Sequence, residues 1–292
     1  MECWAVVEEG SVVSGCDMGR PVPWWSFTKT VLAAAALTLV RDGSLGLDET
    51  LPEKPYTLRH LLQHRSGLAN YGGLAAYHEA VARGEDPWPV PILLERTHAE
   101  RLRYPPGEGW DYSNIGYLFV RQIIQEATGE PLNAALRRLV LTPLGVRTAR
   151  IASALADLDG TPMGDATGYH PGWVYHGLVV GPIEEAALLL DRLLNGGVLP
   201  DDLLAHMRSV HALPGPIPDR QWVLPGYGLG LMSGEVASGL VVEGHTGGGP
   251  GSTIAVYRTS SGPIPRTVAY FATSDERKEA EDEVFRLLGE AS

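Results

Sequence analysis

Cysteine is scarce in this chain. Cys3 and Cys16 are the two cysteines among 292 residues, too few for a disulfide scaffold, and no Cys/His cluster has the spacing of a zinc site. His60 and His64 are four residues apart, as metal ligands on a helix can be, but the glutamate of an H-E-x-x-H motif and a third ligand are both missing. We therefore expect neither a metal nor a cofactor.

The pairing of the two cysteines depends on the turn of a predicted N-terminal hairpin. A two-residue turn at Glu9-Gly10 would place Cys3 opposite Cys16, with Cα atoms about 4.5 Å apart, where a disulfide can form. A turn with a bulge at Gly10 would shift the register by one residue and exclude the bridge. The sequence leaves both registers open, and a reducing compartment would favour free thiols.

Basic residues are also few. The chain has 23 Lys and Arg against 35 Asp and Glu, a formal net charge of −12, and no basic run. This balance argues against nucleic acid or an anionic membrane as a partner. Residues 1–5 include neither a positively charged segment nor a long apolar one, so we expect a cytoplasmic protein.

The most apolar run covers residues 27–40, which are rich in Ala and Leu and contain neither Gly nor Pro. It ends before Asp42-Gly43, where Gly suits a left-handed helix C-cap. The run is too short to span a membrane and is apolar nearly all round. It therefore predicts a helix in the protein core.

Ser26 and Lys29 stand at the start of this helix, three residues apart, so their side chains share one face. A serine hydroxyl needs an adjacent base to become a nucleophile, and burial lowers the pKa of a lysine towards that role. Taken alone, the pair is more simply explained as an N-cap and a solvated lysine in the first turn, and the rest of the chain has to decide between the two interpretations.

Helical patterns fill the middle of the chain and strand patterns occupy its two ends. Helices are predicted at residues 57–64, 74–82, 91–97, 116–127, 132–141 and 183–194, and strands at 4–7, 11–14, 227–232, 240–243, 253–257 and 267–273. A charged amphipathic helix is predicted at 275–288. We expect an α+β fold in which 1–44 and 208–292 form an antiparallel sheet flanked by helices, 45–207 form an inserted helical region, and the active site lies between them.

A segment rich in Pro and Gly, residues 104–114, delivers Tyr112 and Asn114 just before a predicted helix. Such a loop can aim side chains into a cleft. A tyrosine near a cationic lysine can be held partly as phenolate and take the proton of the serine. Alternatively, Tyr112 packs in the interior and Asn114 caps the helix.

The segment H-T-G-G-G-P-G, residues 245–251, lies between two predicted strands. Its glycines would let a substrate backbone lie against the strand edge, and one of its N–H groups could complete an oxyanion hole with that of Ser26. It has neither the lysine nor the helix that would follow in a phosphate-binding loop.

Three elements, Ser26-x-x-Lys29, Tyr112-x-Asn114 and His245-Thr246-Gly247, occur in this order. They resemble the motifs of serine hydrolases of the penicillin-recognising fold, in the branch of class C β-lactamases, D-alanyl-D-alanine carboxypeptidases and family VIII esterases. The resemblance extends beyond these three motifs and covers most of the chain. Further stretches that look like signatures of this family are residues 26–51, 61–68, 106–129, 143–145 and 227–230.

The resemblance implies an antiparallel sheet of five or more strands with flanking helices, beside an all-helical region. It implies that Ser26 is the acylated nucleophile and that Lys29 and Tyr112 are the proton-transfer pair. Asn114 would donate a hydrogen bond to the acyl side of the substrate.

The resemblance also implies substrate binding by His245, Thr246 and Gly247, and an oxyanion hole formed by the amides of Ser26 and Gly248. This third motif begins with His where class C β-lactamases typically have Lys, so a permanent cation for a β-lactam carboxylate is missing. The chain therefore looks more like the peptidase and esterase branches. An E-x-x-x-N deacylation motif is also absent.

We expect a serine hydrolase that forms an acyl-enzyme on Ser26, with small esters, D-amino-acid amides or peptides as substrates. A β-lactamase or an acyltransferase of the same fold is an alternative, and so is a non-catalytic sensor that resembles a penicillin-binding protein. Every motif position is intact, which favours an enzyme. The stretch 163–182 follows no family pattern, and only 25 residues precede Ser26 where family members usually have more.

Overall fold

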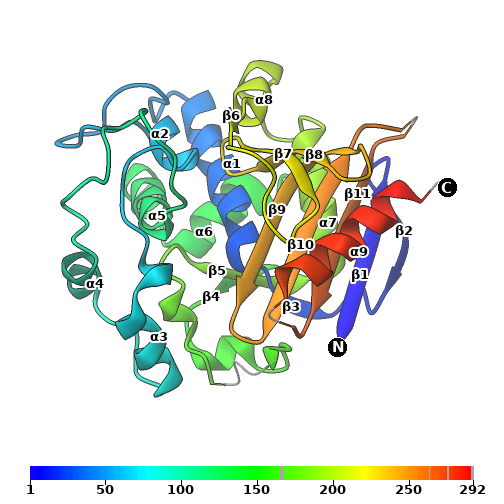
Figure 1. Cartoon of the computed structure of the whole chain (residues 1–292), viewed down its shortest axis with the longest axis horizontal. Coiled ribbons are helices and arrows are strands. Elements are labelled where there is room, and N and C mark those ends of the chain that lie inside the picture. The colour runs from blue at the N-terminus through cyan, green and yellow to red at the C-terminus, as the bar shows by residue number, and fades with distance from the viewer. Residues whose placement is uncertain (165–167, 263, 275, 291–292) are drawn as a thin grey trace.

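A computed structural model describes residues 1–164, 168–262, 264–274 and 276–290. Among these residues, eight strands form an antiparallel sheet in the order β2-β1-β11-β10-β9-β8-β7-β6. The strands are β1 (Glu2–Glu8), β2 (Ser11–Cys16), β6 (His211–Ala212), β7 (Trp222–Tyr227), β8 (Met232–Val236), β9 (Val241–Gly249), β10 (Ser252–Thr259) and β11 (Arg266–Ala272). The two ends of the chain thus build one sheet, with the N-terminal hairpin at its edge, as the sequence predicts (Figure 1).

Helices cover both faces of this sheet. Helix α9 (Arg277–Gly289) lies on the face that is in front in Figure 1, and α7 (Ile183–Leu194) packs behind β1, β10 and β11. The central strands are therefore covered on both faces, and every residue of β10 is buried. Helix α7 falls within the stretch 45–207 that we expected to form the helical region, but it packs on the sheet. The predicted start of the last helix, Asp275, lies outside the described residues.

The other helices form a layer beside the sheet, organised around α1 (Thr28–Arg41). Twelve of the 14 residues of α1 are buried, which confirms the predicted core helix. The predicted helices of the middle of the chain are present: α2 (Leu58–Leu62), α3 (Ala75–Ala82), α4 (Val90–Arg96), α5 (Asn114–Thr128), and α6 (Leu132–Leu136) with the following π-helical turn (Arg137–Leu141). Helix α8 (Asp201–Arg208) was not predicted.

A second sheet, also not predicted, has the order β3 (Pro21–Pro23), β5 (Leu178–Pro182) and β4 (Arg150–Ala152). Its strands have three to five residues, too few to show a period of two. Strand β3 runs directly into the turn that carries Ser26, so this small sheet ties the start of α1 to the helical layer.

The prediction of a strand at residues 227–232 is wrong. Strand β7 ends at Tyr227 and β8 begins at Met232, and the residues between them form a loop against α1. The Thr30 hydroxyl donates to the Gly230 carbonyl at 2.7 Å. A Cβ atom on Gly230 would lie 2.4 Å from Ala33 Cβ, so only glycine allows this approach. The apolar residues of the loop are buried by α1 and not by pairing in the sheet.

The N-terminal hairpin turns at Glu9 and Gly10, whose φ angles of 48° and 75° fit a two-residue type I′ turn. A bulge midway along the hairpin then shifts the register by one residue, so that Trp4 lies opposite Cys16. The turn is the one that would have set Cys3 opposite Cys16, but the bulge prevents that pairing. Both cysteines are free.

The two thiols should react at different rates. Cys16 is exposed, whereas Cys3 is buried and burial raises the pKa of its thiol to about 12. We expect the native protein without reductant to show one fast-reacting thiol in a disulfide-exchange assay and the unfolded protein to show two. Cys16→Ser should remove the fast reaction alone. Protein that yields no titratable thiol on unfolding would contradict the observed register.

Candidate active site

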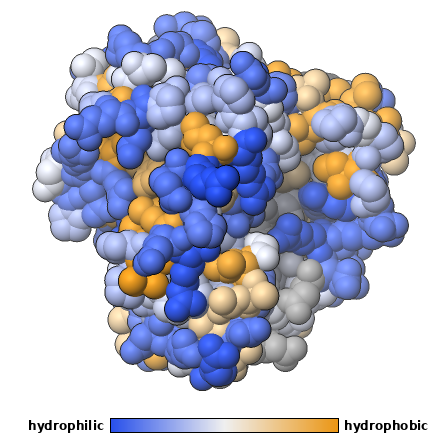
Figure 2. Space-filling model, turned by 60° about the vertical axis from the view of Figure 1, so that its left-hand side comes forward, coloured by the Kyte–Doolittle hydropathy of each residue, from blue (hydrophilic) through white to orange (hydrophobic). Residues whose placement is uncertain are grey.

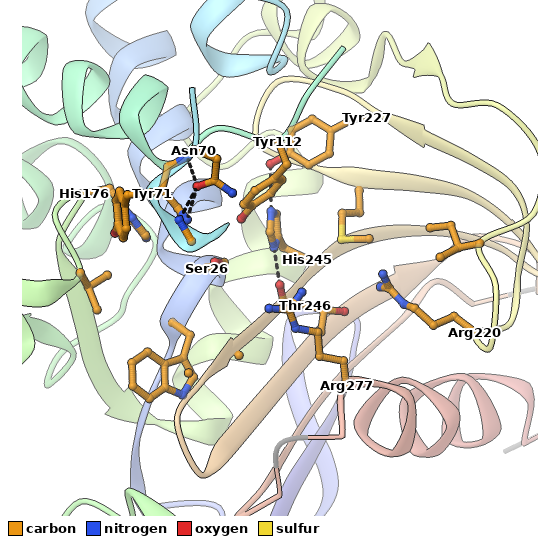
Figure 3. A pocket seen from close by; sticks show the side chains of 18 of the residues that line it. Ser26, Asn70, Tyr71, Tyr112, His176, Arg220, Tyr227, His245, Thr246 and Arg277 are labelled. Carbon is orange, nitrogen blue, oxygen red and sulfur yellow. Dashed lines mark hydrogen bonds between the residues drawn. The ribbon is translucent and has the colours of Figure 1, made fainter. Parts of the chain in front are cut away.

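A cavity of about 630 Å³ opens where β9, the start of α1 and the start of α5 meet (Figure 3). Six of the residues predicted for the site line this cavity: Ser26, Tyr112, Asn114, His245, Thr246 and Gly248. Lys29 lies behind Ser26 and is fully buried. The structure therefore brings together groups that come from three distant parts of the chain.

Ser26 sits in a 3₁₀ turn, Trp25–Phe27, that leads directly into α1. The N-cap of α1 is Phe27 and makes no side-chain cap, so the N-cap interpretation of Ser26 is wrong. Trp25 has a φ of 41°, an unfavourable left-handed conformation for a bulky residue next to the serine. Its indole N–H donates to Ser252 Oγ at 3.0 Å and its ring packs edge-on against Tyr169, which holds this conformation in place.

Lys29 makes three close polar contacts. Its Nζ lies 3.1 Å from Ser26 Oγ, 2.7 Å from Asn114 Oδ1 and 3.3 Å from His176 Nε2. Burial, with a smaller contribution from the charge of Arg277, holds the pKa of Lys29 well below its ordinary value. The interpretation of Lys29 as a solvated residue is therefore wrong, and the site favours its neutral amine.

His176 is a site residue that the sequence did not reveal. It lies between a short helical turn at Pro171–Trp173 and β5, in the stretch that followed no family pattern. The side chain is buried, and burial followed by the nearby Lys29 charge lowers the pKa of His176 well below its usual range. A neutral imidazole can accept a hydrogen bond from Lys29. A lone histidine without a motif gives no signal of this contact.

Tyr112 makes a hydrogen bond to Ser26, which lowers its pKa, but burial dominates and raises the pKa of the phenol to about 12. The Lys29 Nζ lies 5.0 Å from the centre of the Tyr112 ring, and the His64 ring packs on it with a centroid distance of 4.3 Å. The prediction that Tyr112 is held partly as phenolate is wrong, because desolvation of the charged form raises its pKa by more than the hydrogen bond lowers it. Tyr112 is a neutral phenol near pH 7.

Asn114 joins Lys29 to a second asparagine. Its Oδ1 accepts from Lys29 and its Nδ2 donates to Asn70 Oδ1 at 3.0 Å. The cap of α5 is Ser113, whose hydroxyl accepts from the Gly116 N–H at 3.0 Å, so Asn114 is not the cap. Asn70, which the sequence did not reveal as a site residue, lines the same cavity (Figure 3). Two amide side chains therefore face the same side of Ser26.

The outer edge of β9 is open next to Ser26. Strand β8 pairs with β9 only from Val241 to Gly244, and no described strand covers that edge from residue 245 onward. A Cβ atom on Gly247 would lie 2.6 Å from the Ser26 nitrogen, and one on Gly249 would lie 2.4 Å from the Trp25 ring. Glycine is therefore required at both positions, and β9 lies close enough to the Ser26 N–H for the oxyanion hole that we expected there.

The side chains of His245 and Thr246 are engaged within the protein. His245 Nδ1 donates to the Thr246 carbonyl at 2.8 Å, and the Tyr227 hydroxyl lies 2.9 Å from Nε2, where it can donate. Burial lowers the pKa of His245 to about 3, so the ring is neutral. The Thr246 hydroxyl bonds to Tyr257 and Glu281. Neither side chain is left with a free donor for substrate, so binding by this segment depends on its backbone.

The described residues contain no group of three or more His, Cys, Asp or Glu side chains that could hold a metal ion. No helix among them is both long and apolar enough to cross a membrane. The face shown in Figure 2 is mostly hydrophilic, with hydrophobic residues in small separate patches.

A family model described as Beta-lactamase matches residues 3–291. Esterase EstB of Burkholderia gladioli is 31% identical over 229 residues, which make up 66% of this chain and 58% of that protein. A D-aminopeptidase of Cereibacter sphaeroides is 29% identical over 273 residues, which cover 83% of this chain and 51% of the relative. The chain thus spans about half the length of these relatives.

Solved structures show the same fold. The D-amino acid amidase from Ochrobactrum anthropi SV3 complexed with D-phenylalanine superposes with a TM-score of 0.79 at 21% identity, over 99% of this chain and 94% of that one. A D-stereospecific amidohydrolase from Streptomyces sp. gives a TM-score of 0.79 at 22% identity with the same coverage. These likenesses confirm the predicted α+β fold. Because the family model matches residues 3–291, almost the whole of this chain, the chain belongs to the beta-lactamase family.

Proposed function

We propose that this protein is a serine hydrolase that forms an acyl-enzyme on Ser26 and acts on carboxylic esters or on D-amino-acid amides and peptides. The observation that carries the proposal is the 3.1 Å contact between Ser26 Oγ and the fully buried Lys29 Nζ. The names of the relatives, an esterase and D-aminopeptidases, support this substrate class. A cytoplasmic location, which we also propose, is compatible with the free thiols.

Lys29 is the general base of this mechanism. A neutral amine has one lone pair and two N–H bonds, and Lys29 has three polar neighbours. Its N–H bonds donate to Asn114 Oδ1 and His176 Nε2, which leaves the lone pair for the Ser26 hydroxyl. Lys29 takes the hydroxyl proton as Ser26 attacks the substrate carbonyl. The N–H groups of Ser26 and Gly248 stabilise the resulting oxyanion.

Tyr112 protonates the leaving group. With a pKa of about 12 its hydroxyl keeps its proton at neutral pH, and its hydrogen bond to Ser26 places it beside the reacting oxygen. It donates this proton to the departing alcohol or amine and regains one from the Lys29 ammonium. Water then attacks the acyl-enzyme by the reverse route, and Ser26 is released.

The backbone of β9 and the two asparagines bind the substrate. The acyl group of the substrate lies against the open edge of β9 and beside Asn70 and Asn114, which both line the cavity. An ester releases its alcohol, which frees the site for water, whereas a β-lactam leaves its amine tethered to the acyl-enzyme. The neutral His245, whose ring N–H donates to the Thr246 carbonyl, also offers neither a cation nor a free donor to a β-lactam carboxylate. Esters are therefore better substrates than β-lactams.

The proposal predicts that p-nitrophenyl acetate and butyrate are hydrolysed faster than nitrocefin, by a factor on the order of ten or more in kcat/KM. D-alanine amide, assayed on the same preparation, separates esterase from peptidase activity. Ser26→Ala serves as the blank and should be inactive with every substrate. Nitrocefin turnover that equals that of the esters would replace the proposal with a β-lactamase. No turnover and no acylation with any of them would indicate a non-catalytic sensor.

His176 should act as a positioning residue for Lys29. His176→Gln keeps an acceptor oxygen near the Nε2 position, whereas His176→Met removes it. We expect kcat for p-nitrophenyl butyrate to fall about tenfold in the methionine variant with little change in KM, and most of it to be kept in the glutamine variant. If His176→Gln and His176→Met lose the same fraction of kcat while their melting temperatures stay unchanged, His176 only fills space.

A further inference from the structure

The proposed mechanism does not use His64, although this histidine lies close to the catalytic groups. His64 follows the end of α2 and has a left-handed backbone, with a φ of 58°. It is only 1% exposed and does not line the cavity, so it does not touch a bound substrate. A residue other than glycine keeps a left-handed conformation where its surroundings hold it, and the contacts of His64 therefore indicate its role.

His64 holds the backbone on both sides of Tyr112. Its carbonyl accepts from the Asp111 N–H at 3.1 Å, and its Nδ1 accepts from the Ser113 N–H at 3.1 Å. Tyr112 itself lies in a loop outside the helices and strands, where no ladder of backbone hydrogen bonds fixes it. A single residue thus anchors the loop immediately before and immediately after the proposed general acid.

The imidazole ring of His64 also packs on the side chain of Tyr112. The centroids of the two rings are 4.3 Å apart and their planes are tilted by 41°. The other rings near Tyr112, those of His245 and Tyr227, lie at 6.3 and 6.4 Å. At its far end the phenol makes its hydrogen bond to Ser26. The packing of His64 on the ring therefore helps to set where the hydroxyl lies.

The hydrogen bonds of His64 show that it acts by position and not as a base. Burial keeps the ring neutral by holding the pKa of His64 well below its ordinary value. Because Nδ1 accepts from Ser113, the one ring hydrogen is on Nε2, and neither nitrogen is left to accept the phenol proton. Nε2 has no hydrogen-bond partner among the described residues. The ring instead lies among four aromatic rings, which accept an N–H only weakly: Trp110, Tyr112, Tyr117 and Tyr227.

We propose that His64 is a positioning residue for Tyr112, which it holds beside Ser26 so that the phenol can protonate the leaving group. This inference rests on the proposed function. A misplacement of about 1 Å in a catalytic group can cost on the order of 10²-fold in rate. Loss of the His64 ring should therefore slow the reaction most where the leaving group needs a proton.

Three butyrate esters with the same acyl group test this role: p-nitrophenyl, phenyl and ethyl butyrate. The p-nitrophenolate anion leaves without a proton, phenolate leaves less readily, and ethoxide needs protonation. The value of kcat/KM reports the steps up to acylation, in which the leaving group departs. We expect Tyr112→Phe to lower kcat/KM for phenyl and ethyl butyrate about tenfold more than for p-nitrophenyl butyrate.

His64→Asn removes the ring but keeps an acceptor oxygen near the Nδ1 position, and asparagine tolerates the left-handed backbone. We expect this variant to raise the ratio of kcat/KM between p-nitrophenyl and phenyl butyrate about threefold. In the double variant with Tyr112→Phe the ratio should equal that of Tyr112→Phe alone, because His64 acts through Tyr112. His60→Asn is the matched control: His60 lies on α2 against Gly107, and its loss should leave the ratio unchanged.

The proposal is overturned if His64→Asn lowers kcat/KM by the same factor for all three esters, or if its effect on the ratio adds to that of Tyr112→Phe. The ratio does not depend on the fraction of folded enzyme, so a modest loss of stability does not affect it. If His64→Asn does not fold, ¹⁵N NMR of the wild-type histidines decides. A His64 ring protonated on Nε2 alone supports the anchor at Ser113, and one protonated on Nδ1 refutes it.

Failure of the proposed hydrolase function is a different outcome, in which the wild type turns over none of the three esters. In that case, ¹³C NMR with tyrosine labelled at Cζ tests the position of the phenol directly. The signal that is absent from Tyr112→Phe should shift in His64→Asn and stay in place in His60→Asn. A Tyr112 signal that does not move in His64→Asn would refute the positioning role.

Discussion

The complete burial of Lys29 is the constraint on which the rest of the site depends. A charged ammonium in a dry interior carries a large desolvation cost, so the protein either pairs the charge or removes it. Here the three polar neighbours are a hydroxyl, an amide oxygen and an imidazole nitrogen, all neutral. None of them can offset a full positive charge as a carboxylate would. The neutral amine is therefore the stable form, and a neutral amine beside a hydroxyl is a base.

A second constraint is the close approach of β9 to the turn before α1. Gly247 and Gly249 leave no room for a side chain against Ser26 and Trp25. The left-handed backbone of Trp25 costs on the order of 1–3 kcal/mol, which the buried ring contacts and the bond to Ser252 offset. These contacts connect the large sheet to the helical layer at the nucleophile. The cavity lies at this junction, and the large sheet and the helical layer each contribute groups to it.

Much of this organisation could be predicted from the sequence, because it depends on local patterns. The core helix α1 follows from a run without Gly or Pro, and the spacing of Ser26 and Lys29 follows from the helix. The small second sheet could not be predicted, since its strands are too short to show a period. The contact of His176 with Lys29 joins residues 147 positions apart and leaves no trace in either segment. The protonation state of Tyr112 was predicted wrongly because burial, which dominates it, is a property of the folded chain.

Direct titration of Lys29 tests the central claim, that burial makes this lysine the base. The sequence contains three lysines, Lys29, Lys54 and Lys278, and the last two are exposed. Lysine labelled with ¹³C at Cε should therefore give three resolvable signals, and Lys29→Ala identifies the one of interest. The account predicts that the Lys29 signal titrates well below its ordinary pKa of 10.5 and below the two exposed lysines. A Lys29 signal that titrates together with the exposed lysines would contradict it.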